Sequence, residues 1–204
     1  AFQRAMAGLA ERREQDQDDF WSWRDAMYGV APRISPDELR SLATRLYREL
    51  LAGGYTQVVE FHYLQHQEDG APYADELAMA WALVDAARDA GIGLTLLPVL
   101  YAHQGFGKRG LREDQRRFKT DADWVWRACQ RLRQAGVNAG VALHSLRAAH
   151  AADVDALLAR VGDAELPIHI HAAEQTAEVD DCLRLLGQRP VQWLAARLDA
   201  RWQL

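Results

Sequence analysis

Four apolar segments rich in β-branched residues alternate with helical segments along the chain, and this alternation narrows the available folds more than any other feature. The strand-like segments are predicted at residues 55–64, 91–101, 137–145 and 166–173. Strands that are apolar at nearly every position and are joined by helices are typical of a parallel sheet buried on both faces. We therefore predict an α/β fold in which this chain forms part of a parallel β/α barrel.

The helical segments carry their own start and stop signals. Before the first strand, Ser35 can cap a helix, Pro36 suits its first turn and the glycine pair 53–54 can end it. The spacing predicts further helices at about 74–90, 121–135 and 151–161. A doubly wound dinucleotide-binding sheet is the rival fold. That fold would be favoured by a G-x-G-x-x-G turn that opens a helix. Gly105 and Gly107 start such a pattern, but no helix is predicted directly after them, which argues against this fold.

Composition excludes several classes of protein. The 204 residues carry a net charge of −5 and are 49% hydrophobic, which is a globular composition. No apolar run is long enough to cross a membrane, and residues 1–13 lack the apolar core of a signal peptide. Cys129 and Cys182 stand alone, as expected for reduced thiols, so we expect a cytoplasmic protein. The basic cluster at 108–117 contains two acids and no aromatic ladder, so we interpret it as a solvated loop that does not bind nucleic acid.

Polar side chains gather where each predicted strand ends. The first strand ends with a His-Tyr pair, the second with Tyr101 and His103, the third with His144 and Arg147, and the fourth with His171 and Glu174. In parallel α/β barrels the carboxyl ends of the strands meet at one rim, where catalytic groups lie. The sequence therefore predicts an active site at this rim.

The fourth strand carries the most specific pattern. His169 and His171 are two residues apart, so both side chains face the same side of the sheet, and a neutral imidazole there is a competent Zn²⁺ ligand. Glu174 follows where the strand becomes a loop, within reach of a water or a substrate nitrogen as a proton carrier. The alternative is two hydrogen-bonded core histidines and a glutamate near a helix start.

Two further arginines could bind anions. Arg147 can hold a carboxylate through two parallel hydrogen bonds, and His144 could share that anion; the alternative is a solvated loop. Arg24 ends the aromatic stretch 18–24, which more often covers a core than binds a ligand.

Several motifs together resemble one enzyme family. They are Phe-His-Tyr at 61–63, His-Ser-Leu-Arg at 144–147, Phe-Trp-Ser-Trp-Arg at 20–24 and the segments 1–9, 96–101 and 169–182. The chain is thus similar to the N-formimidoyl-L-glutamate deiminases of the amidohydrolase superfamily over nearly its whole length. The His-x-x-Glu element alone marks only the wider group of metal-dependent deaminases.

The resemblance implies a reaction and a set of site residues. Such enzymes hydrolyse N-formimino-L-glutamate to N-formyl-L-glutamate and ammonia in histidine degradation, with one Zn²⁺ in a distorted (β/α)₈ barrel. By this resemblance His171 is the metal ligand and Glu174 the catalytic proton shuttle. The expected substrate-binding residues are Gln3, Arg24, Tyr63, His144 and Arg147. The implied partner is a small dicarboxylate, with no nucleic acid or membrane, and a homodimer is the candidate assembly of the intact protein.

The resemblance also predicts that residues 1–204 are one partial barrel domain. The family carries a His-x-His pair before the stretch that matches Ala1, a histidine after the sixth strand and an aspartate after the eighth. We find none of these here, and residues 201–204 correspond to the start of the sixth strand. We therefore expect a fragment with roughly strands two to five, lacking the barrel elements that flank them. One histidine is too few for a catalytic zinc, so the fragment itself is expected to be inactive.

Two other functions stay open at this point. A zinc-dependent deaminase that acts on guanine or a related ring would share His171 and Glu174, but would not need Arg24 together with Arg147. A non-catalytic half-barrel that pairs with itself is the other alternative, because an open parallel sheet exposes two edges.

Overall fold

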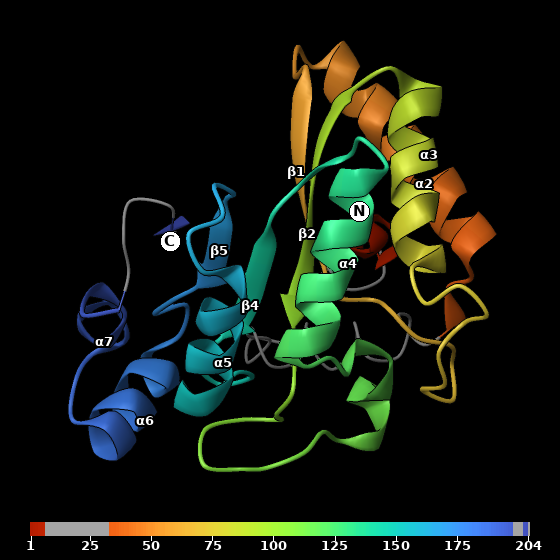
Figure 1. Ribbon diagram of the computed structural model, residues 1–204. Helices are drawn as coiled ribbons and strands as arrows, with labels where there is room; N and C mark the ends of the chain where they lie inside the picture. Colours follow the sequence, from red (N-terminus) through yellow and green to blue (C-terminus); the bar gives the residue numbers. More distant parts are fainter. Residues whose placement is uncertain (7–32, 198–201, 204) are drawn as a thin grey trace, which may run out of the picture. The chain divides into compact units, whose positions relative to one another are not determined.

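The computed structural model describes residues 1–6, 33–197 and 202–203 (Figure 1). The chain divides into two compact units, which we describe separately. The first unit comprises residues 1–60, 64–94 and 113–117, and the second comprises residues 61–63, 95–112 and 118–204.

The first unit is built on two packed helices, α2 (Pro36–Ala52) and α3 (Ala78–Ala90). Ser35 caps α2 as the sequence predicts, since its hydroxyl accepts the Glu38 N–H while the Glu38 carboxylate accepts the Ser35 N–H at 2.8 Å. Helix α3 begins later than predicted. The Asp75 carboxylate accepts the Leu77 N–H at 2.9 Å and so forms a turn before the helix.

Arg117 contradicts the prediction of a solvated basic loop over 108–117. It lies in the short 3₁₀ helix η3 (Glu113–Phe118), and its side chain is buried. Its guanidinium donates to the carbonyls of His66 at 2.6 Å and Ile34 at 2.8 Å, and to the Tyr73 hydroxyl at 3.2 Å. Burial lowers the pKa of this guanidinium. Charge patterning alone could not separate this buried arginine from its exposed neighbours.

The strands follow one another in the sheet in the order in which they occur along the chain. They are β1 (Gln57–His62), β2 (Gly93–Leu100), β3 (Asn138–Ala139), β4 (Val141–Ser145), β5 (Ile168–His171) and β6 (Trp202–Gln203). Within the described residues the order is β1-β2-β4-β5-β6, with β3 also beside β2. Every pair with a determined register is parallel. In a doubly wound sheet the strands stay parallel, but their order along the sheet reverses at a switch point. The order found here shows no such reversal and excludes the rival fold.

The third predicted strand is interrupted at Gly140. A Cβ at this position would lie 2.2 Å from the Pro167 carbonyl oxygen, so only glycine lets the two backbones approach. The strand resumes as β4, where Val141 pairs with Ile168 and Leu143 with Ile170.

Burial of both sheet faces, which we predicted, holds for β2 and β4 but not for β1. Residues 95–100 of β2 are buried, whereas Val59 in β1 is 49% exposed. At the other end, β6 pairs with β5, where the sixth strand of the barrel was expected to start.

Helices cover the second unit. They are α4 (Ala122–Gln134), α5 (Ala151–Val161), α6 (Thr176–Leu186) and α7 (Pro190–Ala195). Helices α4 and α5 pack side by side, and α6 contacts α7 (Figure 1). Helices α6 and α7 were not predicted from the sequence. Among the described residues, no helix has the length and apolar character needed to cross a membrane.

We expect Arg117→Met to lower the free energy of unfolding by about 2–4 kcal/mol, because buried carbonyls would lose their donor. Arg45→Met is the matched control: its side chain is 75% exposed, and its ion pair with Glu49 should contribute less than about 1 kcal/mol. Urea denaturation of the protein that carries this chain checks both values. Equal effects would show that burial of Arg117 does not stabilise the fold.

Candidate functional site

Aromatic and imidazole rings from four neighbouring strand ends meet in the second unit. Phe61 and Tyr63 come from the end of β1, Tyr101 follows β2, His144 lies in β4 and His171 ends β5. Parallel strands deliver their carboxyl ends to the same edge, so residues far apart in the sequence become neighbours.

His144 lies at the centre of this ring cluster. Tyr101 meets it at 4.5 Å between ring centroids, Tyr63 at 5.2 Å and His171 at 5.4 Å, each in an edge-to-face arrangement. Phe61 stacks on His171 at 4.1 Å with 24° between the ring planes. These contacts fix the orientation of both imidazoles.

The histidines of the site favour their neutral form. Burial, together with the nearby His171 and Arg147, places the pKa of His144 well below its usual value. Partial desolvation also lowers the pKa of His169 and of the more exposed His171, although Glu174 partly opposes the effect on His171. A neutral imidazole keeps a lone pair, which a metal ligand or a hydrogen-bond acceptor requires.

Arg147 links the end of β4 to the loop after β5. Its Nη2 lies 2.5 Å from Oε2 of Glu174, and its Nε lies 3.4 Å from the Ser145 hydroxyl, which His144 also contacts. Glu178 lies on the other side of the guanidinium, with Oε2 at 3.9 Å from Nη1. The guanidinium of Arg147 therefore forms ion pairs with two carboxylates.

The loop that carries Glu174 makes an unusual turn. Ala173 has a φ of 57°, in the left-handed region that residues with a Cβ seldom adopt. The turn lies between the end of β5 at His171 and the start of α6 at Thr176. It directs Glu174 toward Arg147.

The structure thus joins five of the predicted site residues through a chain of contacts: Tyr63, His144, Arg147, His171 and Glu174. Their individual roles remain predictions. Gln3 lies in the 3₁₀ helix η1 (Phe2–Met6) of the first unit, and Arg24 lies outside the described residues. The alternative of a solvated Arg147 is wrong, because its side chain is only 15% exposed.

Sequence reasoning missed Glu178. Its side chain is fully buried in the first turn of α6. An acid four residues after a candidate catalytic glutamate, at the start of a helix, was the available signal.

His171 fits the role of a metal ligand. Its ring lies at the end of β5, and within the described part of the chain its nitrogens make no hydrogen bond. A catalytic zinc site typically takes three protein ligands, so this residue would supply one member of such a set.

A second group of possible metal ligands lies beside the loop after β2. Ligand atoms of His103, His150 and Asp153 all lie within 4.8 Å of one another, so this group could hold a metal ion. Its imidazoles are stacked at 3.9 Å with only 10° between their planes. Of the three, His103 is one of the polar residues predicted to gather at the strand ends, but none was predicted to bind a metal or substrate or to act in catalysis.

Hydrogen bonds give this group another role. Asp153 accepts from Nε2 of His103 at 2.9 Å and from the His150 N–H at 2.8 Å, while Gly110 N–H donates to Nδ1 of His103 at 3.3 Å. Nε2 of His150 bonds to the Gly105 carbonyl at 3.1 Å. Binding a metal would require the rings to give up these bonds. The group therefore anchors the loop to the start of α5.

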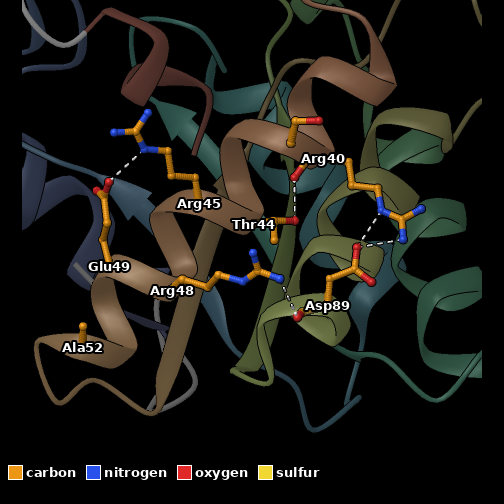
Figure 2. A pocket seen from close by; sticks show the side chains of 8 residues that line it. Arg40, Thr44, Arg45, Arg48, Glu49, Ala52 and Asp89 are labelled. Carbon is orange, nitrogen blue, oxygen red and sulfur yellow. Dashed lines mark hydrogen bonds and ion pairs between the residues drawn. The ribbon is translucent and has the colours of Figure 1, made fainter.

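Figure 2 shows a pocket on the surface of α2 in the first unit. Its charged residues pair with one another: Arg40 with Asp89 at 2.7 Å, and Arg45 with Glu49 at 3.1 Å. None of its lining residues is a predicted site residue, and exposed ion pairs of this kind contribute little binding or stability. We therefore do not assign the functional site to this pocket.

The fold and the strand-end cluster place the chain in a known class. Residues 7–196 match the amidohydrolase family, and the chain belongs to that family. It is 48% identical over 210 aligned residues to the formimidoylglutamate deiminase of Pseudomonas aeruginosa; the match covers 100% of this chain and 46% of that protein. The chain therefore spans about half the length of this relative.

Solved structures agree with the predicted fold. A crystal structure of an amidohydrolase from Brucella melitensis matches with a TM-score of 0.90 and 48% identity, over 99% of this chain and 46% of that one. An atrazine chlorohydrolase from Arthrobacter aurescens, complexed with zinc, matches with a TM-score of 0.73 and 20% identity, over 96% of this chain and 43% of that one. The α/β prediction, as part of an amidohydrolase barrel, is confirmed.

We expect Asp153→Ala to speed amide hydrogen exchange at Gly110 by about tenfold or more, because the acceptor that holds His103 would be lost. Asp155→Ala, on the same helix with a side chain 62% exposed, is the matched control and should leave exchange unchanged. Metal content of the full-length protein is measured in parallel. Loss of one metal equivalent with unchanged loop exchange would show that this group is a metal site instead.

Proposed function

We propose that the full-length protein carrying this chain hydrolyses N-formimino-L-glutamate to N-formyl-L-glutamate and ammonia, a step of histidine degradation. The observation that carries the proposal is the Arg147–Glu174 pair beside two imidazoles at the strand ends. It supplies a cation for a substrate carboxylate and a carboxylate for proton transfer. The identity of 48% to a formimidoylglutamate deiminase along the whole chain supports the same substrate.

Glu174 is proposed as the proton shuttle. Its carboxylate is 35% exposed, so it can exchange protons with a water and a substrate. In the hydrolysis it would take a proton from the attacking water and return it to the departing nitrogen as ammonia leaves. Arg147 must release Glu174 for this step, and a substrate carboxylate offers the arginine a replacement partner.

The remaining predicted residues would hold the substrate. We propose that Arg147 and Arg24 neutralise its two carboxylates, with Gln3, Tyr63 and His144 as further polar contacts. Two arginines suit a dicarboxylate because each can bind one carboxylate through two hydrogen bonds. A purine-like ring offers no such partners.

We propose one Zn²⁺ per active site, with His171 as one ligand and the others outside this chain. Membership of the amidohydrolase family and the zinc in the chlorohydrolase structure support a metal. When bound, zinc would make water a stronger acid and so a better nucleophile near neutral pH. With a single ligand of the set, the 204-residue chain alone is proposed to be inactive.

The setting of the protein is also part of the proposal. Cys129 and Cys182 are buried free thiols, which supports a reducing cytoplasm. We propose a small dicarboxylate as the partner, without nucleic acid or membrane, and a homodimer as the assembly of the intact protein. Residues 1–204 would be one partial barrel domain within it.

The full-length, zinc-loaded protein should release ammonia from N-formimino-L-glutamate and not from guanine. Coupled ammonia detection measures both rates, and N-formyl-L-glutamate is identified as the second product. Turnover of guanine alone would support a ring deaminase on the same fold. A zinc-loaded protein that turns over neither substrate would contradict the proposed reaction.

Glu174→Gln should lower kcat by about 10²–10⁴-fold, because the amide cannot carry the proton, while zinc content stays at the wild-type value. Glu165→Gln, an exposed glutamate before β5, is the control and should leave kcat unchanged. Steady-state kinetics and metal analysis of both variants check this. Loss of zinc together with activity would indicate a structural role for Glu174.

A further inference from the structure

We propose that Glu178 is a positioning residue that holds both the Ala173–Glu174 turn and one side of the Arg147 guanidinium. The inference rests on the proposed function, because it explains how the proton shuttle and the substrate-binding arginine are kept in place. Glu178 itself need not touch the substrate.

Glu178 is the buried carboxylate of this site. Glu178 lies in the first turn of α6, where acidic side chains usually face solvent, but its side chain has no exposed surface. A charge is buried only where groups of opposite polarity surround it. Here those groups are the start of α6, Arg147 and the backbone amide of Glu174.

This amide belongs to the turn that carries the proposed proton shuttle. Glu174 N–H donates to Oε2 of Glu178 at 3.1 Å. Ala173 is the described non-glycine residue with a positive φ. A left-handed residue persists when surrounding bonds fix it, and the carboxylate of Glu178 supplies one, to the N–H of the next residue, Glu174.

The same carboxylate shares Arg147 with Glu174. Oε2 of Glu178 lies 3.9 Å from Nη1, while Nη2 pairs with Glu174 at 2.5 Å. Oε1 of Glu178 is buried and makes no hydrogen bond within the described residues. A small movement of the guanidinium toward Glu178 would satisfy this oxygen and free Glu174, so Glu178 can retain Arg147 when substrate enters.

The test compares Glu178→Gln in the full-length zinc enzyme with Asp181→Asn, a surface change on the same helix whose carboxylate pairs with Arg184 at 2.6 Å. Glu178→Gln keeps the shape but removes the anion. We expect KM for N-formimino-L-glutamate to rise about tenfold and kcat to fall about tenfold, with zinc content unchanged and Asp181→Asn at wild-type values.

A second comparison asks whether the effect passes through Arg147. In an Arg147→Met background, Glu178→Gln should raise KM no further, because the guanidinium that it positions is gone. The same factor in both backgrounds, or a Glu178→Gln variant within twofold of wild type, would overturn the proposal. If Glu178→Gln fails to fold, Glu178→Asp, which keeps the charge, should show a smaller rise in KM, and a wild-type KM would overturn it.

A third readout needs no substrate. The amide of Glu174 should exchange hydrogen faster in Glu178→Gln than in Asp181→Asn, and equal exchange would contradict the positioning role. Failure of the wild-type enzyme to release ammonia would instead reject the proposed reaction and leave this measurement to decide the role of Glu178.

Discussion

Parallel pairing of consecutive strands is the constraint on which the site depends. Because β2, β4 and β5 run the same way and lie in sequence order, their carboxyl ends meet at one edge. Tyr101, His144 and His171 become neighbours for this reason alone. If one strand ran in the opposite direction, its carboxyl end and the polar residues there would lie at the other edge of the sheet. The site therefore forms only with this parallel topology.

Charge balance at this edge is the second condition. Arg147 lies near His144 and His171 and helps to keep both imidazoles neutral, while Glu174 and Glu178 compensate its own charge. Removing either carboxylate would leave a largely buried cation with a weaker partner, which is costly in a region of low polarity. The two carboxylates therefore stabilise the buried charge of Arg147, the same charge that is proposed to bind a substrate carboxylate.

Local signals in the sequence were enough for most elements, because hydrophobic periodicity and caps act over a few residues. The Ser35 cap and the four alternating strands are examples. Tertiary contacts decided the exceptions. The third strand is interrupted at Gly140, where the Pro167 carbonyl lies too close to admit a Cβ. Arg117 can be buried because three groups far from it in the sequence accept hydrogen bonds from its guanidinium. The site residues at the strand ends combine both kinds of information. The apolar pattern predicted where each strand ends, and the parallel topology brings those ends together.

Glu178 shows where such reasoning stops and why. As a first-turn acid of a helix it has an ordinary explanation, stabilisation by the helix dipole, which requires no burial. Its proposed second role exists only because the chain turns at Ala173 and brings the Glu174 amide to the Glu178 carboxylate. A turn of that kind needs an acceptor at a fixed distance and cannot be inferred from residue type. Glu174 could therefore be singled out from the sequence, whereas the residue proposed to hold it in place required the structure.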